Sequence, residues 1–156
     1  MGRITLNQLA PDFTLTDVSG ESVTLSAFRG QKNVLLVFNR GFFWPYCRGH
    51  MAQLRRDYEK LQSANIEVVV IGPEDTAAFQ DYWSKNDLPY IGLADPSLAV
   101  PKLFGQEFKL LKMGRMPAQM FLDKDGMVRF AYYGQSMRDI PRTEQLLADI
   151  APYIPG

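Results

Sequence analysis

Two uninterrupted apolar runs constrain the fold of this 156-residue chain more than any other feature. They are NVLLVFN at residues 33–39 and IEVVVIG at residues 66–72, and runs of this kind are typical of strands buried on both faces. Between them, apolar side chains recur at intervals of three and four from Cys47 to Leu61, which is the spacing of one helix face. This order of strand, helix and strand predicts parallel pairing within a buried sheet.

The remaining sequence predicts further helices and strands around this unit. Alternating apolar and polar residues around a Ser-Gly turn predict a hairpin over residues 12–28, and an Asp-Gly turn predicts a second hairpin over residues 118–134. Between the hairpins we expect an amphipathic helix, a short strand and a short helix, at residues 75–86, 90–95 and 98–104. A last helix is expected at residues 142–150. Because no repeat or linker interrupts the pattern, we expect one domain over residues 1–156.

Composition and charge argue against several classes of function. The chain has 17 basic and 17 acidic residues, so nothing in its charge favours nucleic acid as a partner. It has no apolar run long enough to cross a bilayer, and we expect no membrane partner and a cytoplasmic location. A single cysteine and a single histidine exclude a disulfide framework and a cysteine-based zinc site, so neither a metal nor another cofactor is expected.

The single cysteine, Cys47, lies in the segment FNRGFFWPYCRGHM, just after the first buried run. The pattern places it in the first turn of a helix, where Pro45 fits because a missing N–H group costs nothing there. Unpaired amides at a helix start favour a thiolate, and Arg40 and, more weakly, Arg48 are expected to add to this. The alternative is that Cys47, on an apolar helical stripe, is an inert packing residue.

Four segments together resemble one protein family over nearly the whole chain. They are APDFTLTD, RGFFWPYCRGHM, LADPSLAV and MPAQMFLDKDG. The sequence is similar to the peroxiredoxins of the alkyl hydroperoxide reductase and thiol-specific antioxidant group. The resemblance implies a thioredoxin-like α/β fold, with a central mixed sheet flanked by helices and an N-terminal hairpin extension.

The closest motif in that family reads Arg-Gly-x-Trp-Cys-Pro-Tyr-Cys. It matches this chain at Arg40, Gly41, Pro45, Tyr46 and Cys47, whereas Trp44 stands where the motif has its first cysteine. Typical peroxiredoxins have a threonine there. The resemblance assigns Cys47 to the peroxidatic position. With no second cysteine in the chain, it implies regeneration by an external thiol reductant, either a thioredoxin-like protein or a small thiol.

A second departure from the family concerns the strand just before the FLD stretch at residues 121–123. Typical peroxiredoxins have an arginine on this strand that helps to ionise the thiol, but the aligned residue here is Pro117. A proline at this place resembles the cis-proline of thioredoxins, so we predict a cis Met116–Pro117 bond close to Cys47. We expect Arg40 to supply the missing charge, with Arg115 as the second choice.

Neighbouring residues complete the expected site. Trp44, Pro45, Tyr46 and Pro117 are the residues expected to form the substrate pocket, and Phe42 is expected to complete the core, as is Phe43. His50 follows Cys47 by three positions on the same helix. We expect a partly exposed His50 with at most a minor role.

The leading prediction is a thiol-dependent peroxidase that reduces hydrogen peroxide or organic hydroperoxides through Cys47. One alternative is a binding or scaffold protein of the thioredoxin fold whose redox centre is disabled by Trp44. A thiol-disulfide oxidoreductase is a weaker alternative, because releasing a mixed disulfide needs a second thiol. The sequence leaves the peroxide, the reductant and the oligomeric state open, a homodimer included.

Overall fold

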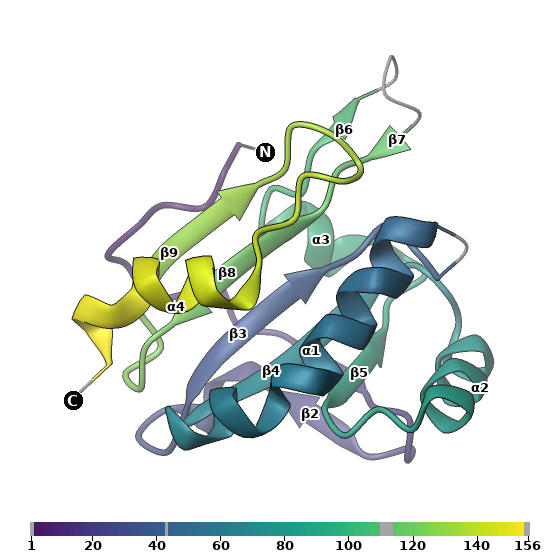
Figure 1. The fold of residues 1–156 in the computed structure, drawn as a ribbon, viewed down its shortest axis with the longest axis horizontal. Coiled ribbons are helices and arrows are strands. Elements are labelled where there is room, and N and C mark those ends of the chain that lie inside the picture. Colours follow the sequence, from purple (N-terminus) through teal and green to yellow (C-terminus); the bar gives the residue numbers. More distant parts are fainter. Residues whose placement is uncertain (1, 43, 110–113, 155–156) are drawn as a thin grey trace.

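The computed structural model describes residues 2–42, 44–109 and 114–154. Its centre is a five-stranded sheet in the order β5-β4-β3-β8-β9 (Figure 1). The strands are β3 (Asn33–Phe38), β4 (Ile66–Gly72), β5 (Ile91–Ala94), β8 (Ala118–Leu122) and β9 (Val128–Tyr133). The first three are parallel to one another. Strand β8 pairs with β3 in the antiparallel direction, and β9 pairs with β8 in the antiparallel direction. The predicted parallel unit and the second hairpin are therefore confirmed.

Helices cover one face of the sheet, and the N-terminal hairpin and a short helix cover the other. The first layer contains α1 (Pro45–Ser63), α2 (Thr76–Asn86) and α4 (Thr143–Ile150). The second contains β1 (Thr14–Thr16), β2 (Ser22–Thr24), η1 (Leu25–Phe28) and α3 (Ala99–Leu103). A 3₁₀ turn, η3 (Ala151–Tyr153), follows α4. Figure 1 shows α1 and α4 lying side by side across the sheet.

The two layers explain why the strands at the centre of the sheet are continuously apolar. All six residues of β3 are buried. Val34, Leu36 and Phe38 face the hairpin layer, whereas Leu35 and Val37 face the helices. Since successive side chains of a strand point to opposite faces, a strand buried on both sides needs apolar residues at every position.

The boundaries of α2, α3 and α4 agree with the sequence within one residue, and those of α1 within two. Asp75 is the N-cap of α2, with its side chain accepting the Ala78 N–H at 2.9 Å. Leu98 precedes α3 with a left-handed backbone (φ 64°), and Pro101 lies inside this short helix. The sequence did not predict the small hairpin of β6 (Phe108–Lys109) and β7 (Gly114–Arg115), because two-residue strands give no measurable alternation.

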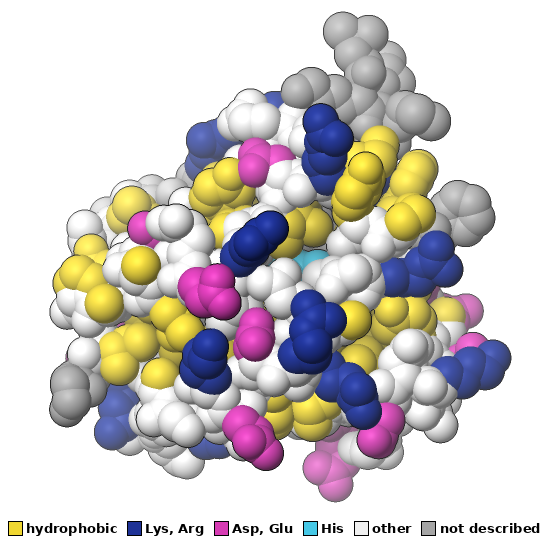
Figure 2. Space-filling view, viewed as in Figure 1, with side chains coloured by type: hydrophobic (Ala, Val, Ile, Leu, Met, Phe, Trp, Pro, Cys, Tyr) yellow, Lys and Arg dark blue, Asp and Glu magenta, His cyan; other side chains and the backbone are white. Residues whose placement is uncertain are grey.

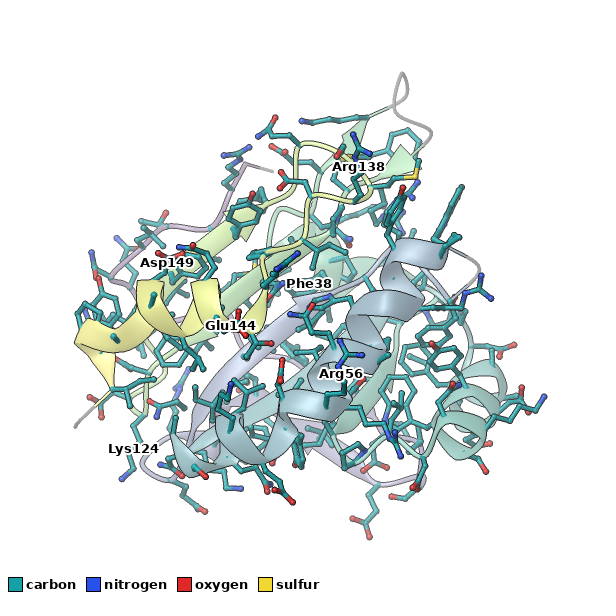
Figure 3. All side chains as sticks on the ribbon, in the orientation of Figure 1. Phe38, Arg56, Lys124, Arg138, Glu144 and Asp149 are labelled. Atoms are coloured by element: carbon teal, nitrogen blue, oxygen red, sulfur yellow. The ribbon has the colours of Figure 1, made fainter. Side chains whose placement is uncertain are left out.

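The outer surface of the helical layer is mixed in charge. Figure 2 shows basic and acidic side chains interspersed over the described part of this face. In Figure 3, Phe38 at the end of β3 is labelled between α4 and α1, and Arg56 is labelled on α1, where its side chain is exposed. Cys47 lies at the N-terminal end of the same helix, on its buried side.

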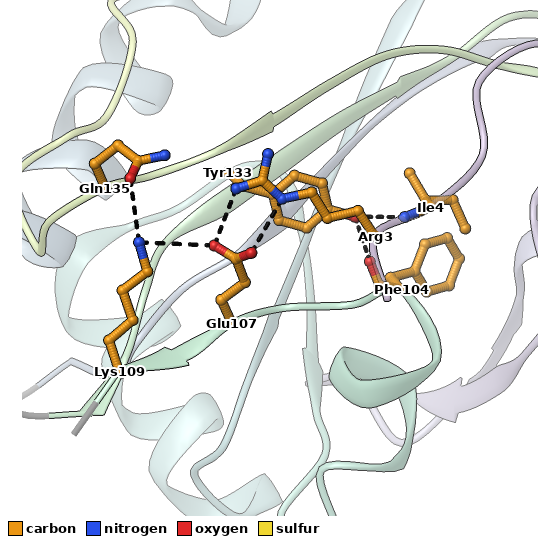
Figure 4. A network of polar contacts seen from close by, with 7 residues as sticks. All are labelled: Arg3, Ile4, Phe104, Glu107, Lys109, Tyr133 and Gln135. Carbon is orange, nitrogen blue, oxygen red and sulfur yellow. Dashed lines mark hydrogen bonds and ion pairs between the residues drawn. The ribbon is translucent and has the colours of Figure 1, made fainter. Parts of the chain in front are cut away.

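The N-terminal segment is fastened to the sheet by a polar network (Figure 4). Arg3 donates two hydrogen bonds to Glu107, at 3.0 and 3.2 Å, and the ammonium of Lys109 lies 3.9 Å from the same carboxylate. The Tyr133 hydroxyl accepts the Ile4 N–H at 2.8 Å and donates to a carbonyl in the α3 region. These contacts join the chain start, β6 and β9.

Candidate active site

Cys47 lies at the junction between β3 and α1. The strand ends at Phe38, and a connecting loop (residues 39–42 and 44) leads to α1, of which Cys47 is the third residue. The Arg40 N–H donates to the Cys47 Sγ at 3.3 Å. The predicted position in the first helical turn, within reach of backbone N–H groups, is thus confirmed. Parallel strands deliver such junctions to one edge of the sheet, where ligand sites of α/β proteins commonly form.

Burial dominates the acidity of this thiol. The Cys47 side chain is 0% exposed, and this burial raises its pKa. The amides of Arg40 and Gly41 and the Arg40 guanidinium act in the opposite direction, whereas the charge of Glu74 raises the pKa further. The amides and the arginine thus act on the thiol in the expected direction, but the net direction of its pKa is upward. Desolvation outweighs them.

Arg40 is fixed between an aromatic ring and a carbonyl group. Its guanidinium carbon lies 4.0 Å from the centroid of the Trp44 ring, a cation–π arrangement. Its Nε donates to the carbonyl of Arg115. Of the two predicted arginines, Arg40 is the one beside Cys47, because its amide donates to the sulfur and its charge acts on the thiol. Arg115 takes part through its main-chain carbonyl, which accepts the bond from the Arg40 side chain.

Trp44 precedes α1 as its N-cap residue and is half-buried. Pro45 begins the helix, and Tyr46 is 45% exposed. Pro45 and Tyr46 line a surface hollow of about 230 Å³ together with His50, Gly49, Gln53, Arg138 and Ile140. Of the four residues expected to form one pocket, the structure brings these two together, while Trp44 and Pro117 are not among the described residues that line it.

The prediction of a cis proline is wrong. No cis peptide bond occurs among the described residues, so Met116–Pro117 is trans. The main chain on both sides is hydrogen-bonded: the Met116 N–H donates to the Glu107 carbonyl at 2.7 Å, and the Pro117 carbonyl accepts the Gly134 N–H at 2.8 Å. This pairing requires a straight path into β8, which a trans bond provides. Pro117 lies against Gly134, the residue after β9.

His50 is buried. The prediction of a partly exposed histidine is therefore wrong. His50 is 6% exposed, and its Nε2 lies 3.3 Å from the Gln119 side-chain amide on β8. In the orientation found, the amide NH₂ donates, so the imidazole nitrogen must be unprotonated. Burial lowers the pKa of His50 to about 4.

We expect this histidine to make stability depend on pH. Its folded pKa lies below the ordinary 6.5, so the unfolded chain binds a proton first as the pH falls. The stabilisation is complete above about pH 6.5 and is lost between there and about pH 4, by about 3 kcal/mol. Urea unfolding of the wild type and His50→Gln at pH 7 and pH 4 measures it. The variant should lose about 3 kcal/mol less across this range, and equal losses in both proteins would contradict the assignment.

Two further residues of this region were missed by sequence reasoning. Glu74 follows β4 and accepts the Phe42 N–H at 2.6 Å. Asn39 follows β3 and is 2% exposed. The signal was available, because polar residues directly after neighbouring parallel strands meet at one sheet edge. Phe42 packs in the core as predicted, stacked on Tyr82, whereas Phe43 lies outside the described residues.

The described residues contain no group of three or more histidine, cysteine, aspartate or glutamate side chains able to hold a metal ion. Within the same ranges, no helix combines the length and apolar character needed to span a membrane.

Comparison with known proteins gives one consistent result. Residues 6–131 match the AhpC/TSA family. The chain is 33% identical over 136 residues to peroxiredoxin Q, chloroplastic, of Oryza sativa subsp. japonica, covering 86% of this chain but only 61% of that protein. It is 32% identical over 152 residues to peroxiredoxin Q, chloroplastic, of Sedum lineare, covering 95% and 80%.

The fold has equally clear relatives among solved structures. The crystal structure of peroxidoxin BcpB from Mycobacterium tuberculosis superposes with a TM-score of 0.83 at 20% identity, covering 96% of this chain and 98% of that one. At this identity the likeness shows the fold alone. It confirms the expected thioredoxin-like α/β architecture with its N-terminal hairpin.

Proposed function

We propose that this chain, which belongs to the AhpC/TSA family, is a thiol-dependent peroxidase in which Cys47 reduces hydrogen peroxide or an organic hydroperoxide. The observation that carries the proposal is the hydrogen bond from the Arg40 amide to the Cys47 Sγ, with the Arg40 guanidinium held nearby on Trp44. An amide and a cation from one residue both favour a thiolate at this sulfur.

The reaction we propose has two stages. The Cys47 thiolate attacks one oxygen of the peroxide; the O–O bond breaks, the sulfur becomes a sulfenic acid, and the other oxygen leaves as water or an alcohol after taking up a proton. An external thiol then displaces water from the sulfenic acid to form a mixed disulfide. A second external thiol releases Cys47 as the thiol, and the reductant leaves as its own disulfide.

The reductant must come from outside because the chain contains one cysteine. The tryptophan at position 44 supplies no thiol to capture the sulfenic acid. A small thiol or a thioredoxin-like protein would serve, and the relatives' name, peroxiredoxin Q, supports peroxide as the oxidant. The chain spans 61% of the length of the rice relative, and the peroxidase activity of the whole protein is part of this proposal.

A second candidate is a binding or scaffold protein of the same fold with a disabled redox centre. The complete burial of Cys47 and its raised pKa favour this alternative. A thiol-disulfide oxidoreductase is disfavoured, because a single cysteine cannot release a mixed disulfide by itself.

Trapping of the oxidised sulfur decides between these functions. The reduced protein is treated with one equivalent of hydrogen peroxide in the presence of dimedone, and the intact mass is measured. We expect one dimedone adduct at Cys47, forming faster as the pH rises above neutral because the pKa of the thiol is raised. Without dimedone, an added small thiol should restore the free cysteine. A chain that stays unmodified under these conditions while remaining folded would favour the scaffold alternative.

Location and assembly belong to the same proposal. We propose a cytoplasmic protein, although the plant relatives named above are chloroplastic. Fluorescence microscopy of a tagged chain in its own cell tests the location. Light scattering of the purified protein tests a homodimer, and a single monomer mass at all concentrations would exclude one.

A further inference from the structure

A carboxylate from a different strand is inserted beside the loop that precedes Cys47. Glu74 lies two residues after β4, and its side chain occupies the space between Gly41 and Gly72. A Cβ atom on Gly41 would lie 2.8 Å from the Glu74 Oε2, and one on Gly72 would lie 3.2 Å from its Oε1. Two glycines therefore leave the room that this carboxylate fills.

Glu74 fixes the connecting loop through one residue. Its Oε2 accepts the Phe42 N–H at 2.6 Å. The Phe42 ring is stacked on Tyr82 at 4.1 Å and meets Phe79 edge-on at 4.8 Å, both on α2. Phe42 is thus held at its main chain and at its side chain. The two residues before it, Arg40 and Gly41, carry the amides that face the Cys47 sulfur.

The charge of Glu74 opposes that of Arg40 at the sulfur. Arg40, two residues after β3, favours the thiolate, whereas Glu74, two residues after β4, disfavours it. From α2, Tyr82 interacts with both Cys47 and Glu74, and Arg48 on α1 interacts with Tyr82.

Neither a charged histidine nor a second hydrogen bond offsets the charge of Glu74 among the described residues. His50 on α1 is neutral at pH 7 because burial lowers its pKa to about 4. The Glu74 Oε1 is buried and has no hydrogen-bond partner among the described residues, so little local hydrogen bonding offsets its charge.

We propose that Glu74 is a positioning residue for the Cys47 thiol: it holds the connecting loop in place through Phe42, and its carboxylate, inserted beside Gly41, opposes the effect of the Arg40 charge at the sulfur. The proposal rests on the proposed function for its biological meaning, because Glu74 would lower the thiolate fraction of a peroxidase cysteine. Its test is independent of peroxide turnover.

The single cysteine makes a direct titration feasible. Protein labelled with [3-¹³C]cysteine gives one resonance, whose shift reports ionisation of Cys47. Glu74→Gln keeps an acceptor for the Phe42 N–H but removes the charge. We expect its titration midpoint to fall by about one pH unit relative to the wild type, since a nearby like charge shifts a pKa by this order. Glu59→Gln removes the same charge from the exposed face of α1 and should leave the midpoint unchanged.

The outcomes separate the charge of Glu74 from its packing role. Glu74→Asp keeps the charge, so its midpoint should fall less than half as far as that of Glu74→Gln. Equal shifts in both variants, or no shift in Glu74→Gln, would overturn the proposal. If the midpoint falls as expected while no variant consumes peroxide, the role of Glu74 stands and the proposed function fails.

If Glu74→Gln does not fold, a measurement on the wild-type chain still tests whether the charges of Glu74 and Cys47 interact. The carboxylate ¹³C resonance of Glu74 should move as Cys47 ionises, and this movement should vanish in Cys47→Ser. A resonance that is indifferent to the ionisation would also refute the proposal.

Discussion

Replacing Cys47 by serine is expected to abolish thiol-dependent peroxide consumption. A serine hydroxyl stays protonated at neutral pH and forms no counterpart of a sulfenic acid, so the first step of the proposed reaction has no nucleophile. The measurement is the rate of peroxide loss with excess small thiol, compared with reductant alone. We expect the variant to fall to the rate of the reductant alone.

Met51→Leu is the matched control for this substitution. Met51 lies one helical turn further along the same buried face of α1 and also carries a buried sulfur. Leucine nearly conserves its volume, so the fold should tolerate the change. Peroxide consumption should stay at the wild-type rate. If Cys47→Ser consumes peroxide as fast as the wild type, Cys47 is not the catalyst and the scaffold function replaces the peroxidase.

Replacing Arg40 by methionine is expected to slow sulfenic acid formation about a hundredfold, the usual cost of removing one preorganised electrostatic contact. The main-chain N–H to the sulfur remains in this variant, so the loss reports on the guanidinium alone. Because Arg40 favours the thiolate, its removal should also move the pH midpoint of the rate upward. Stopped-flow measurement of dimedone-trapped oxidation across pH gives both quantities.

Two arginine variants test the specificity of this effect. Arg40→Lys keeps a charge but loses the planar contact with Trp44 and the geometry of the bond to the Arg115 carbonyl, so an intermediate rate is expected. Arg56→Met removes the same charge from the exposed face of α1 and should leave the rate within twofold. A loss in Arg40→Met no larger than in Arg56→Met would remove Arg40 from the proposed site.

Much of the fold follows from local patterns. The runs at 33–39 and 66–72 predict buried parallel strands because each strand packs on both faces. The apolar spacing from Cys47 to Leu61 predicts α1 and places the sulfur in its first turn. Such periods are set by neighbours a few residues apart, so a sequence records them directly.

The chemistry of the site depends on contacts that no local pattern records. Burial of His50 comes from packing against β8, 69 positions away. The trans bond before Pro117 follows from pairing on either side of it, with Glu107 and Gly134.

The sequence by itself therefore determined the architecture and the position of Cys47, because strand and helix periods are local. Only the tertiary structure decided how acidic the thiol is. Its pKa depends on exclusion of water and on charges such as that of Glu74, which is far from it along the chain and beside it in space.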